Sequence, residues 1–598
     1  MAKEKKHSTN DLLFPIIFIL SLLPFITRLL IYDCSLSSYS WFPKNGISSD
    51  FFTYYKGYTL IIIAVLCAFI LPVYLLVKSG SRKQIKQFIP LLIYFVFVSL
   101  STIFSDYRSI ALSGTNGHFE GFYVLLAYMI LFLYSYFISD MKKDIRWILI
   151  SLVFTSVGMC VIGFCQIFQQ DPIQWDFVQK LVMSADNYNN YAGSLRTFFT
   201  TNAVSLTLAN PNYASTFLAM LISFFSVYLI CVPDKKKKIA LAGLLLGLFS
   251  ILFMTLSRGG LLAVIVSLLV LLFILRKELL RRKKGLLVSI LLLFVIYLLF
   301  DVVNSFQYTR KIVATLQSFK GTTKEENLGQ IITGTDSISL TYQHETVNVS
   351  FQNTSPQTTL HFEDAKHNSQ DAYFDTTTGK LDVTPFDKLT FALSKDATAS
   401  FINISIDGTV WPFCYTKVDG YQYYNYFERL EKLEKIPAIG FKGHENLASN
   451  RAYIWSRTFP LLKDSILIGS GPDTFPIVFP QNDRVGKLYN CKYVYSIVEK
   501  AHSLYLQIAT QTGVLSLLAF LVFYGIYLVQ TLRVLKDFST NSPLHVFALA
   551  CLLLTISYMT SSLFNDSVIQ TSPMFWVMLG LGFSANAELG KNEFVKTK

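Results

Sequence analysis

The stretch that decides the fold is ANPNYASTFLAMLISFFSVYLICVPDKKKK, residues 209–238. It contains an uninterrupted apolar run of ~20 residues, the length that an α-helix needs to cross the hydrocarbon core of a membrane. Two asparagines around a proline open the run, and four consecutive lysines follow its end. The stretch therefore predicts a membrane-spanning helix with a cytoplasmic, lysine-rich end and an external, polar end.

The composition of the whole chain is also that of a membrane protein. Of its 598 residues, 52% are hydrophobic and 15% are charged, whereas about a quarter of the residues of a soluble domain are charged. Further apolar runs predict an α-helical polytopic protein with about twelve membrane-spanning helices. Their expected extents are 12–32, 58–78, 89–105, 121–139, 147–168, 211–232, 239–256, 260–275, 285–302, 510–532, 543–563 and 573–588.

Lysine and arginine collect in alternate short loops between these runs. With the amino terminus inside, the cytoplasmic loops contain KSGSRKQIK, MKKDIR, DKKKK, RKELLRRKKG and RVLKD, and the opposite loops are poor in both residues. This bias predicts a multi-pass protein of the cytoplasmic membrane with both termini in the cytoplasm. It also accounts for the net charge of +13 through contact with lipid headgroups, so we expect no nucleic-acid partner.

One external loop is much longer than the others and divides the chain into three parts. Residues 1–305 are expected to hold the first nine spans, 306–505 the external loop and 506–598 the last three spans. Within the loop, the alternating runs SISLTYQ, TVNVSFQ, KLTFALS and SFINISIDG predict a strand-rich, sandwich-like insert over 330–425. The helical spacing of NRAYIWSRTFPLLKDS favours a helical lid over 426–505.

Two ionisable side chains stand at the external membrane boundary, where an unpaired charge is costly. Arg258 lies in SRGG, where Gly259 and Gly260 would permit a very tight turn between two spans. His502 lies just before the tenth span, and histidine is the side chain best suited to proton transfer near neutral pH. The competing interpretations are an arginine that reaches the headgroups and a histidine of no special role.

Some of the neighbouring polar residues have simple structural explanations. Asn210 is expected to cap the helix that follows Pro211, which leaves Asn212 unexplained. Arg451 and Trp455 are four residues apart and should share one helix face. A solvated helix surface is the interpretation for Arg457 and Arg484.

Taken in order, the motifs ANPNYAS, SRGG, NRAYIWS…IGSGPDTF and AHSLYLQ…TGVLS resemble those of the O-antigen ligase and polymerase superfamily, which are bacterial membrane glycosyltransferases of the C-type fold. The resemblance in order and topology extends from about residue 90 to the end of the chain. Two motifs depart from the usual pattern, because LTLANPN replaces GTLGNPN and HS replaces HN. The fold that the resemblance implies is a C-type glycosyltransferase fold with an additional strand-rich insert.

The resemblance implies an enzyme that moves a glycan from polyprenyl diphosphate to a hydroxyl of a glycan, lipid or protein outside the cytoplasm. Arg258 and Arg451 would then hold the diphosphate and His502 would be the base. Residues expected to bind substrate are Arg196, which would replace an arginine that the family often has before the asparagine motif, together with Asn210, Asn212 and Trp455. No Asp-x-Asp motif lies outside, so we expect neither metal nor cofactor.

Three alternatives remain open from the sequence. A protein O-oligosaccharyltransferase of the same superfamily would share these motifs. A transporter of lipid-linked sugars would need ionisable residues near the middle of the bilayer, and the expected spans contain almost none. A membrane-anchored glycan-binding or sensory protein would need only an anchor, for which about twelve spans are excessive.

Overall fold

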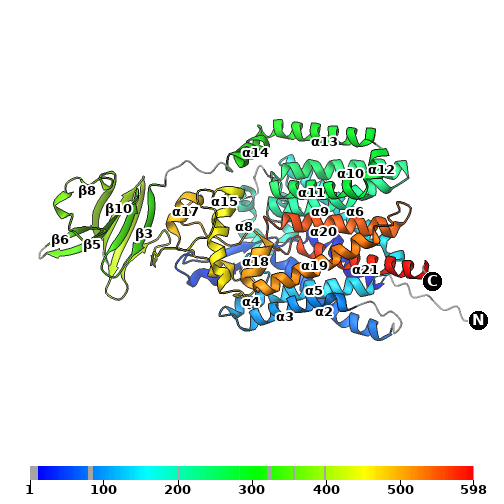
Figure 1. Cartoon of the computed structure of the whole chain (residues 1–598), viewed down its shortest axis with the longest axis horizontal. Helices are drawn as coiled ribbons and strands as arrows, with labels where there is room; N and C mark the ends of the chain where they lie inside the picture. The colour runs from blue at the N-terminus through cyan, green and yellow to red at the C-terminus, as the bar shows by residue number, and fades with distance from the viewer. Residues whose placement is uncertain are drawn as a thin grey trace, which may run out of the picture.

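The structure is a computed structural model that describes the backbone of residues 11–77, 85–198, 203–281, 283–318, 326–354, 357–395 and 399–596. It is elongated: a helical bundle carries a layer of short helices and loops at one end, and a module of strands lies beyond that layer (Figure 1). The last helix runs to the opposite end of the bundle.

The long helices follow the apolar runs of the sequence, and each of the predicted spans contains a helix. They are α1 (Phe14–Ser21), α2 (Tyr54–Val77), α3 (Ile89–Ile103), α5 (Phe122–Ile138), α6 (Met141–Ile167), α9 (Pro211–Cys231), α10 (Lys235–Met254), α11 (Arg258–Ile274), α13 (Lys283–Val303), α19 (Val514–Val534), α20 (Pro543–Ser561) and α21 (Ser572–Lys596). Among the described residues, seven helices are long and apolar enough to cross a membrane. The protein is thus a mostly helical, multi-pass membrane protein, and the count of about twelve spans stays a prediction.

The first expected span, 12–32, is wrong as a continuous helix. The regular α1 has only eight residues, and a 3-10 turn over Leu23–Phe25 follows it. Pro24 cannot donate a backbone hydrogen bond and interrupts the helix there. The chain then enters a strand, β1 (Leu30–Asp33), which pairs antiparallel with β2 (Ile47–Asp50).

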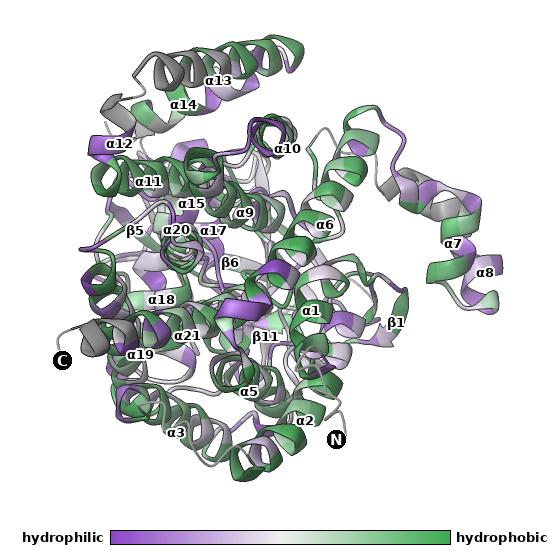
Figure 2. Ribbon diagram, turned by 90° about the vertical axis from the view of Figure 1, so that its right-hand side faces the viewer, coloured by the Kyte–Doolittle hydropathy of each residue, from purple (hydrophilic) through white to green (hydrophobic). Residues whose placement is uncertain are grey.

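Two helices form the centre of the bundle. The apolar windows of α9 and α20 are each 83% buried, against 39% or less for the other five of the seven. Helices α5, α11, α19 and α21 are arranged around this centre, with α13 at the periphery (Figure 2). The first residue of α9 and the last residue of α20 lie at the end of the bundle that carries the lid, so this end is held by the best-packed helices.

Shorter helices lie between the spans. They are α4 (Arg108–Ser113), α7 (Asp176–Val182), α8 (Ala185–Phe198), α12 (Arg276–Arg281), α14 (Gln307–Ser318), α15 (Leu447–Thr458), α16 (Phe475–Val478), α17 (Arg484–Asn490) and α18 (Leu504–Gln511). Three of them, α15, α16 and α17, lie within the lid segment 426–505. Helix α15 occupies the segment NRAYIWSRT whose spacing favours a helix.

The strand module consists of two antiparallel sheets with a common hydrophobic core. One sheet has the order β3-β4-β5-β6 and the other the order β13-β12-β11-β10-β9, with a small β7-β8 pair beside them. The bounds are β3 (Leu328–Thr333), β4 (Ile338–Tyr342), β5 (Glu345–Thr354), β6 (Gln357–Asp364), β7 (Phe374–Asp375), β8 (Lys380–Leu381), β9 (Thr390–Lys395), β10 (Ser400–Ile406), β11 (Thr409–Thr416), β12 (Gly420–Tyr424) and β13 (Leu430–Glu431). The strands therefore extend slightly beyond the expected 330–425.

The lid packs directly against this module, and here the interpretation of two arginines as solvated is wrong. Arg484 is 2% exposed, and its guanidinium donates to both carboxylate oxygens of Glu431 on β13, at 2.6 and 2.7 Å from Nη2. The Arg457 side chain is 14% exposed, and its Nε lies 2.9 Å from Asp483 Oδ2. Helical spacing alone could not reveal these partners, because Glu431 and Asp483 come from other elements.

The arrangement of the helices leads to a topology prediction. Lys236 lies in the first turn of α10, and Thr390 lies on a strand beyond the lid. Single cysteines at these positions, in a chain whose eight native cysteines are replaced, should react differently with an impermeant thiol reagent on intact cells. We expect labelling of Thr390→Cys and protection of Lys236→Cys, because the lysine-rich end faces the cytoplasm. Labelling of Lys236→Cys would refute this orientation.

Candidate active site between the lid and the bundle

The start of α9 is fixed by its two asparagines. The Asn210 side chain accepts a hydrogen bond from the backbone N–H of Asn212 at 2.8 Å, so Asn210 is the helix cap that the sequence predicts. The Asn212 side chain plays a different part, because its Oδ1 accepts a hydrogen bond from Ser257 Oγ at 2.9 Å. Asn212 therefore ties the start of α9 to the residue that precedes Arg258.

The expected glycine turn in SRGG is wrong. Arg258, Gly259 and Gly260 form the first turn of α11, and the turn is made earlier, at Leu256, whose φ is +54°. A Cβ on Gly260 would lie 2.6 Å from Ser215 Cβ on α9. Gly260 is thus required for close contact between two helices, and this contact sets the position of Arg258.

Arg258 and Arg451 meet at the start of α15. Ala448, Ser449 and Asn450 all have left-handed backbone conformations, with φ of 53°, 61° and 66°. Three such residues in succession are rare without glycine and store strain of the kind that clusters at functional sites. Arg258 donates from Nη2 to Ser449 Oγ, and Arg451 donates from Nη1 to the carbonyl oxygen of Ala448 at 3.0 Å. One strained turn therefore holds both guanidinium groups.

A third cation, Lys311, belongs to the same cluster. It lies on α14, and its Nζ donates to the carbonyl oxygen of Leu256 at 3.1 Å, while its own carbonyl oxygen accepts from Arg258 Nη1 at 3.2 Å. Burial and the nearby charge of Arg258 lower the pKa of Lys311. We call Arg258, Lys311 and Arg451 the cationic cluster.

His502 lies beside the cationic cluster, immediately before α18. Its Nδ1 is 3.6 Å from Oδ2 of Asp566, a distance that allows ion pairing but is too long for a good hydrogen bond. Asp566 is buried in the loop between α20 and α21, and this Oδ2 has no hydrogen-bond partner among the described residues. Partial removal from water is the largest effect on the pKa of His502, whose side chain stays 41% exposed. The charge of Asp566 opposes this effect without outweighing it, the charges of Arg451 and Lys500 add to it, and the pKa falls to about 4. The imidazole ring is therefore neutral at physiological pH. The backbone of His502 has a φ of +51°, which again marks a constrained conformation.

Trp455 supports this arrangement from the lid side. Its indole Nε1 donates to the carbonyl oxygen of Ala501 at 3.0 Å, one residue before His502. Its ring also lies 6.2 Å from that of Phe564, two residues before Asp566. Trp455 thus contacts both segments that carry the imidazole and its carboxylate.

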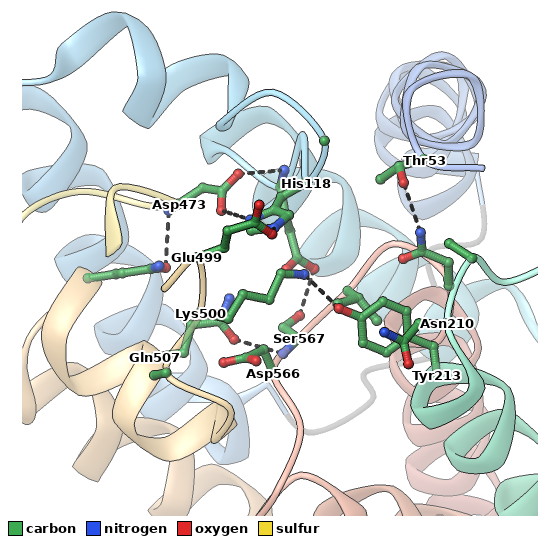
Figure 3. Close-up of a pocket in the computed structure, with 17 residues that line it drawn as sticks. Thr53, His118, Asn210, Tyr213, Asp473, Glu499, Lys500, Gln507, Asp566 and Ser567 are labelled. Carbon is green, nitrogen blue, oxygen red and sulfur yellow. Dashed lines mark hydrogen bonds and ion pairs between the residues drawn. The ribbon is translucent and has the colours of Figure 1, made fainter. Parts of the chain in front are cut away.

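A polar cavity of about 190 Å³ adjoins this site. Figure 3 shows its side chains, with Lys500 extending toward Tyr213. Four carboxylates and two basic side chains line it: Glu120, Asp473, Glu499, Asp566, His118 and Lys500. We call it the acidic cavity. Asn210, Gln507 and Gln511 contribute amide groups to its wall.

The acidic cavity contains a network of paired charges. His118 lies between Asp473, 3.2 Å from Nδ1, and Glu499, 3.4 Å from Nε2. Burial and Lys500 oppose the charged ring, but the two carboxylates outweigh them and raise the pKa of His118. Burial raises the pKa of Glu120 to about 7, although Ser567 and Tyr128 donate hydrogen bonds to it.

The site therefore contains most of the predicted residues and several that the sequence reasoning missed. Arg258, Arg451, His502, Trp455, Asn210 and Asn212 all lie between the lid and this end of the bundle. Arg196 lies on α8, and its side chain is outside the described part of the chain. The missed Asp566 had a signal, because it is an ionisable residue three positions after the expected span 543–563. Lys311 lies nine positions after the expected span 285–302 and had a weaker one. His118 also stands next to an expected span, 121–139, but only the fold brings Asp473 and Glu499 to it.

Fold and site together define a multi-pass membrane protein with a cationic cluster, a neutral histidine and a polar cavity between the lid and the bundle. Residues 413–521 match the O-antigen ligase family, and the match includes α15, His502 and α18. The resemblance to the O-antigen ligase superfamily is thereby confirmed, and this family implies an O-antigen-ligase-type activity with glycan and lipid partners. No curated protein and no solved structure matches the chain.

Proposed function

We propose that this protein is a glycosyltransferase that moves a glycan from polyprenyl diphosphate to an acceptor hydroxyl on the outer face of the bacterial cytoplasmic membrane. One observation carries the proposal: a cationic cluster lies beside a histidine that is neutral at physiological pH. The first can stabilise a leaving diphosphate, and the second can accept the proton of an attacking hydroxyl.

The cationic cluster supplies the charge that this leaving group requires. As the bond between the anomeric carbon and the diphosphate oxygen breaks, negative charge develops on the diphosphate. Guanidinium groups match phosphate oxygens in geometry and remain charged. Because Arg258 and Arg451 are held by one turn, they are preorganised and need little rearrangement during the reaction.

His502 takes the proton. The acceptor oxygen forms a bond to the anomeric carbon, the bond to the diphosphate breaks, and the hydroxyl proton passes to the imidazole, with inversion at that carbon. Asp566 lies beside Nδ1, which leaves Nε2 as the atom that accepts the proton and places a carboxylate next to the imidazolium that forms. A bound diphosphate would raise the low pKa of His502 by its negative charge and so strengthen the base.

The acceptor can be a glycan, a lipid or a protein, and a protein O-oligosaccharyltransferase would use the same cluster and base. A transporter of lipid-linked sugars is the alternative from another class. It would move the intact donor across the bilayer, whereas an enzyme would break the glycosyl–diphosphate bond.

The deciding experiment uses the purified full-length protein in proteoliposomes with lipid-linked glycan extracted from the source membranes. We expect release of free polyprenyl diphosphate together with a glycosylated product, both measured by mass spectrometry. Transfer of intact donor between leaflets without release of polyprenyl diphosphate would favour the transporter and refute the enzyme.

A second expectation concerns metal ions. If Arg258, Lys311 and Arg451 neutralise the diphosphate, no divalent cation is needed for that purpose. The turnover of lipid-linked donor should therefore be unchanged in excess EDTA. A loss of turnover that Mg²⁺ or Mn²⁺ restores would show that the cationic cluster alone does not suffice.

A further inference from the structure

We propose that the acidic cavity binds one uncharged, hydroxyl-rich sugar unit of the acceptor. This inference rests on the proposed function and adds to it a location and a chemical class for the second substrate. Its basis is the charge, the hydrogen-bonding groups, the size and the position of the cavity.

The charges of the cavity and of the cationic cluster would direct the donor and the acceptor to different places. The carboxylates of Asp473, Glu499 and Asp566, with Glu120 when it is ionised, line the cavity against Lys500 and His118. The cluster instead presents two guanidinium groups and an ammonium group. Like charges repel strongly in a partly desolvated site. A diphosphate is therefore directed to the cluster and kept out of the cavity, which is left for a ligand without negative charge.

The free hydrogen-bonding groups of the cavity match those of a sugar. Gln511 is 6% exposed and its Oε1 accepts from the backbone N–H of Asp473, while Gln507 Oε1 accepts from the backbone N–H of Ser567. Their Nε2 groups donate to no other described residue, and Oδ2 of the buried Asp566 accepts from none. Hydroxyl groups both donate and accept, so a polyol can satisfy these amides and carboxylates together.

Size and position point to the acceptor. A volume of about 190 Å³ is on the scale of a single sugar unit, so a longer acceptor would extend past Glu499, whose side chain is 62% exposed. Lys500 and Ala501 line the cavity and directly precede His502, and Asp566 belongs both to the cavity wall and to the surroundings of the imidazole. A sugar bound here lies next to the base that would activate one of its hydroxyls.

The binding test uses full-length protein in nanodiscs and saturation-transfer NMR with methyl glycosides of glucose, galactose and N-acetylglucosamine. Methyl glucuronide is the anionic probe. We expect binding of at least one neutral glycoside and none of the glucuronide. Absence of binding by all three neutral probes, or equal binding of the glucuronide, would overturn the inference.

Two nearly isosteric variants assign the binding to this cavity. Gln507→Glu keeps an oxygen for the Ser567 N–H but removes the free amide donor, and should weaken neutral glycoside binding about five- to tenfold, the effect of one hydrogen bond. Glu499→Gln removes one carboxylate and should allow the glucuronide to bind. The matched control is Glu434→Gln, an exposed lid carboxylate that does not line the cavity, and it should change neither. Unchanged binding in both cavity variants would place the sugar elsewhere.

Kinetics separate this inference from the proposed function. With donor in excess, Gln507→Glu should raise the acceptor KM about five- to tenfold, again the effect of one hydrogen bond, and leave kcat and donor binding unchanged. If the unmodified protein never cleaves the donor, the proposed function fails, while the nanodisc measurement still decides whether the cavity binds sugar. If donor is cleaved and the acceptor KM stays constant in Gln507→Glu, only the cavity inference fails.

Discussion

Arg258→Ala and Arg451→Ala should each reduce donor turnover about a hundred- to a thousandfold. Each change removes a preorganised cationic donor from the leaving diphosphate, and the loss of one such donor costs ~3–4 kcal/mol of transition-state stabilisation. Arg258→Lys should also lower donor turnover strongly, because an ammonium group cannot replace the bidentate hydrogen bonding of a guanidinium group. The measurement is release of polyprenyl diphosphate in proteoliposomes, normalised to the amount of protein in the membrane.

Arg310→Ala is the matched control for these variants. Arg310 precedes Lys311 on α14 but is exposed, and among the described residues its Nη2 donates to the carbonyl oxygen of Ser305 alone. It should keep nearly full turnover. Arg457, which the sequence suggested as a neutral control, is unsuitable because it pairs with Asp483 and lies 4.6 Å above the Tyr453 ring. Normal turnover in Arg258→Ala and Arg451→Ala would contradict the assignment of the diphosphate to the cluster.

His502→Ala should reduce the rate of transfer about 10²- to 10⁴-fold, the usual contribution of a general base. Donor binding should persist because the cationic cluster is intact. In the unmodified protein the base is active when it is neutral, and its pKa is lowered to about 4. The acid limb of kcat/KM, which reports the free enzyme, should therefore lie near pH 4, well below that of an ordinary histidine.

The acid limb of kcat provides an internal check on this assignment. It reports the enzyme with donor bound, where the diphosphate raises the pKa of His502, so it should lie at a higher pH than the limb of kcat/KM. Asp566→Asn should keep the fold but lower kcat, since the carboxylate no longer supports the imidazolium. Transfer at the unmodified rate in His502→Ala would exclude this histidine as the base.

Hydropathy predicted the positions of the long helices along the chain well for physical reasons. Apolar runs of sufficient length have few alternatives to a membrane helix, and strands β4, β5, β9 and β10 coincide with runs that alternate in polarity. The same local patterns misled at α1, where Pro24 interrupts an otherwise apolar run, and at Gly260, which serves contact between helices rather than a turn. The first interruption is local, because Pro24 lies in the apolar run itself, whereas Gly260 depends on Ser215, which is distant in sequence.

The candidate site was predictable only where its residues are chemically conspicuous at a span end. Arg258 and His502 stand out for this reason. The cavity is different, because His118 meets Asp473 across 355 residues of sequence and Glu499 across a still longer stretch. Single-sequence patterns carry no information on such pairs. The low pKa of His502 likewise results from its surroundings in the folded protein and not from its neighbours in sequence.

The buried pair of Arg484 and Glu431 has a consequence for truncated and chimaeric variants of this protein. Val485, Leu488, Tyr489 and Val494 of the lid pack against the core of the strand module, and the pair lies beside them. A truncation that removed the strands alone would leave a desolvated arginine without its carboxylate and an uncovered apolar surface on the lid, which carries part of the candidate site. A chimaera with a related protein must therefore exchange the strand module and the lid together, with both junctions near the ends of the membrane-spanning helices.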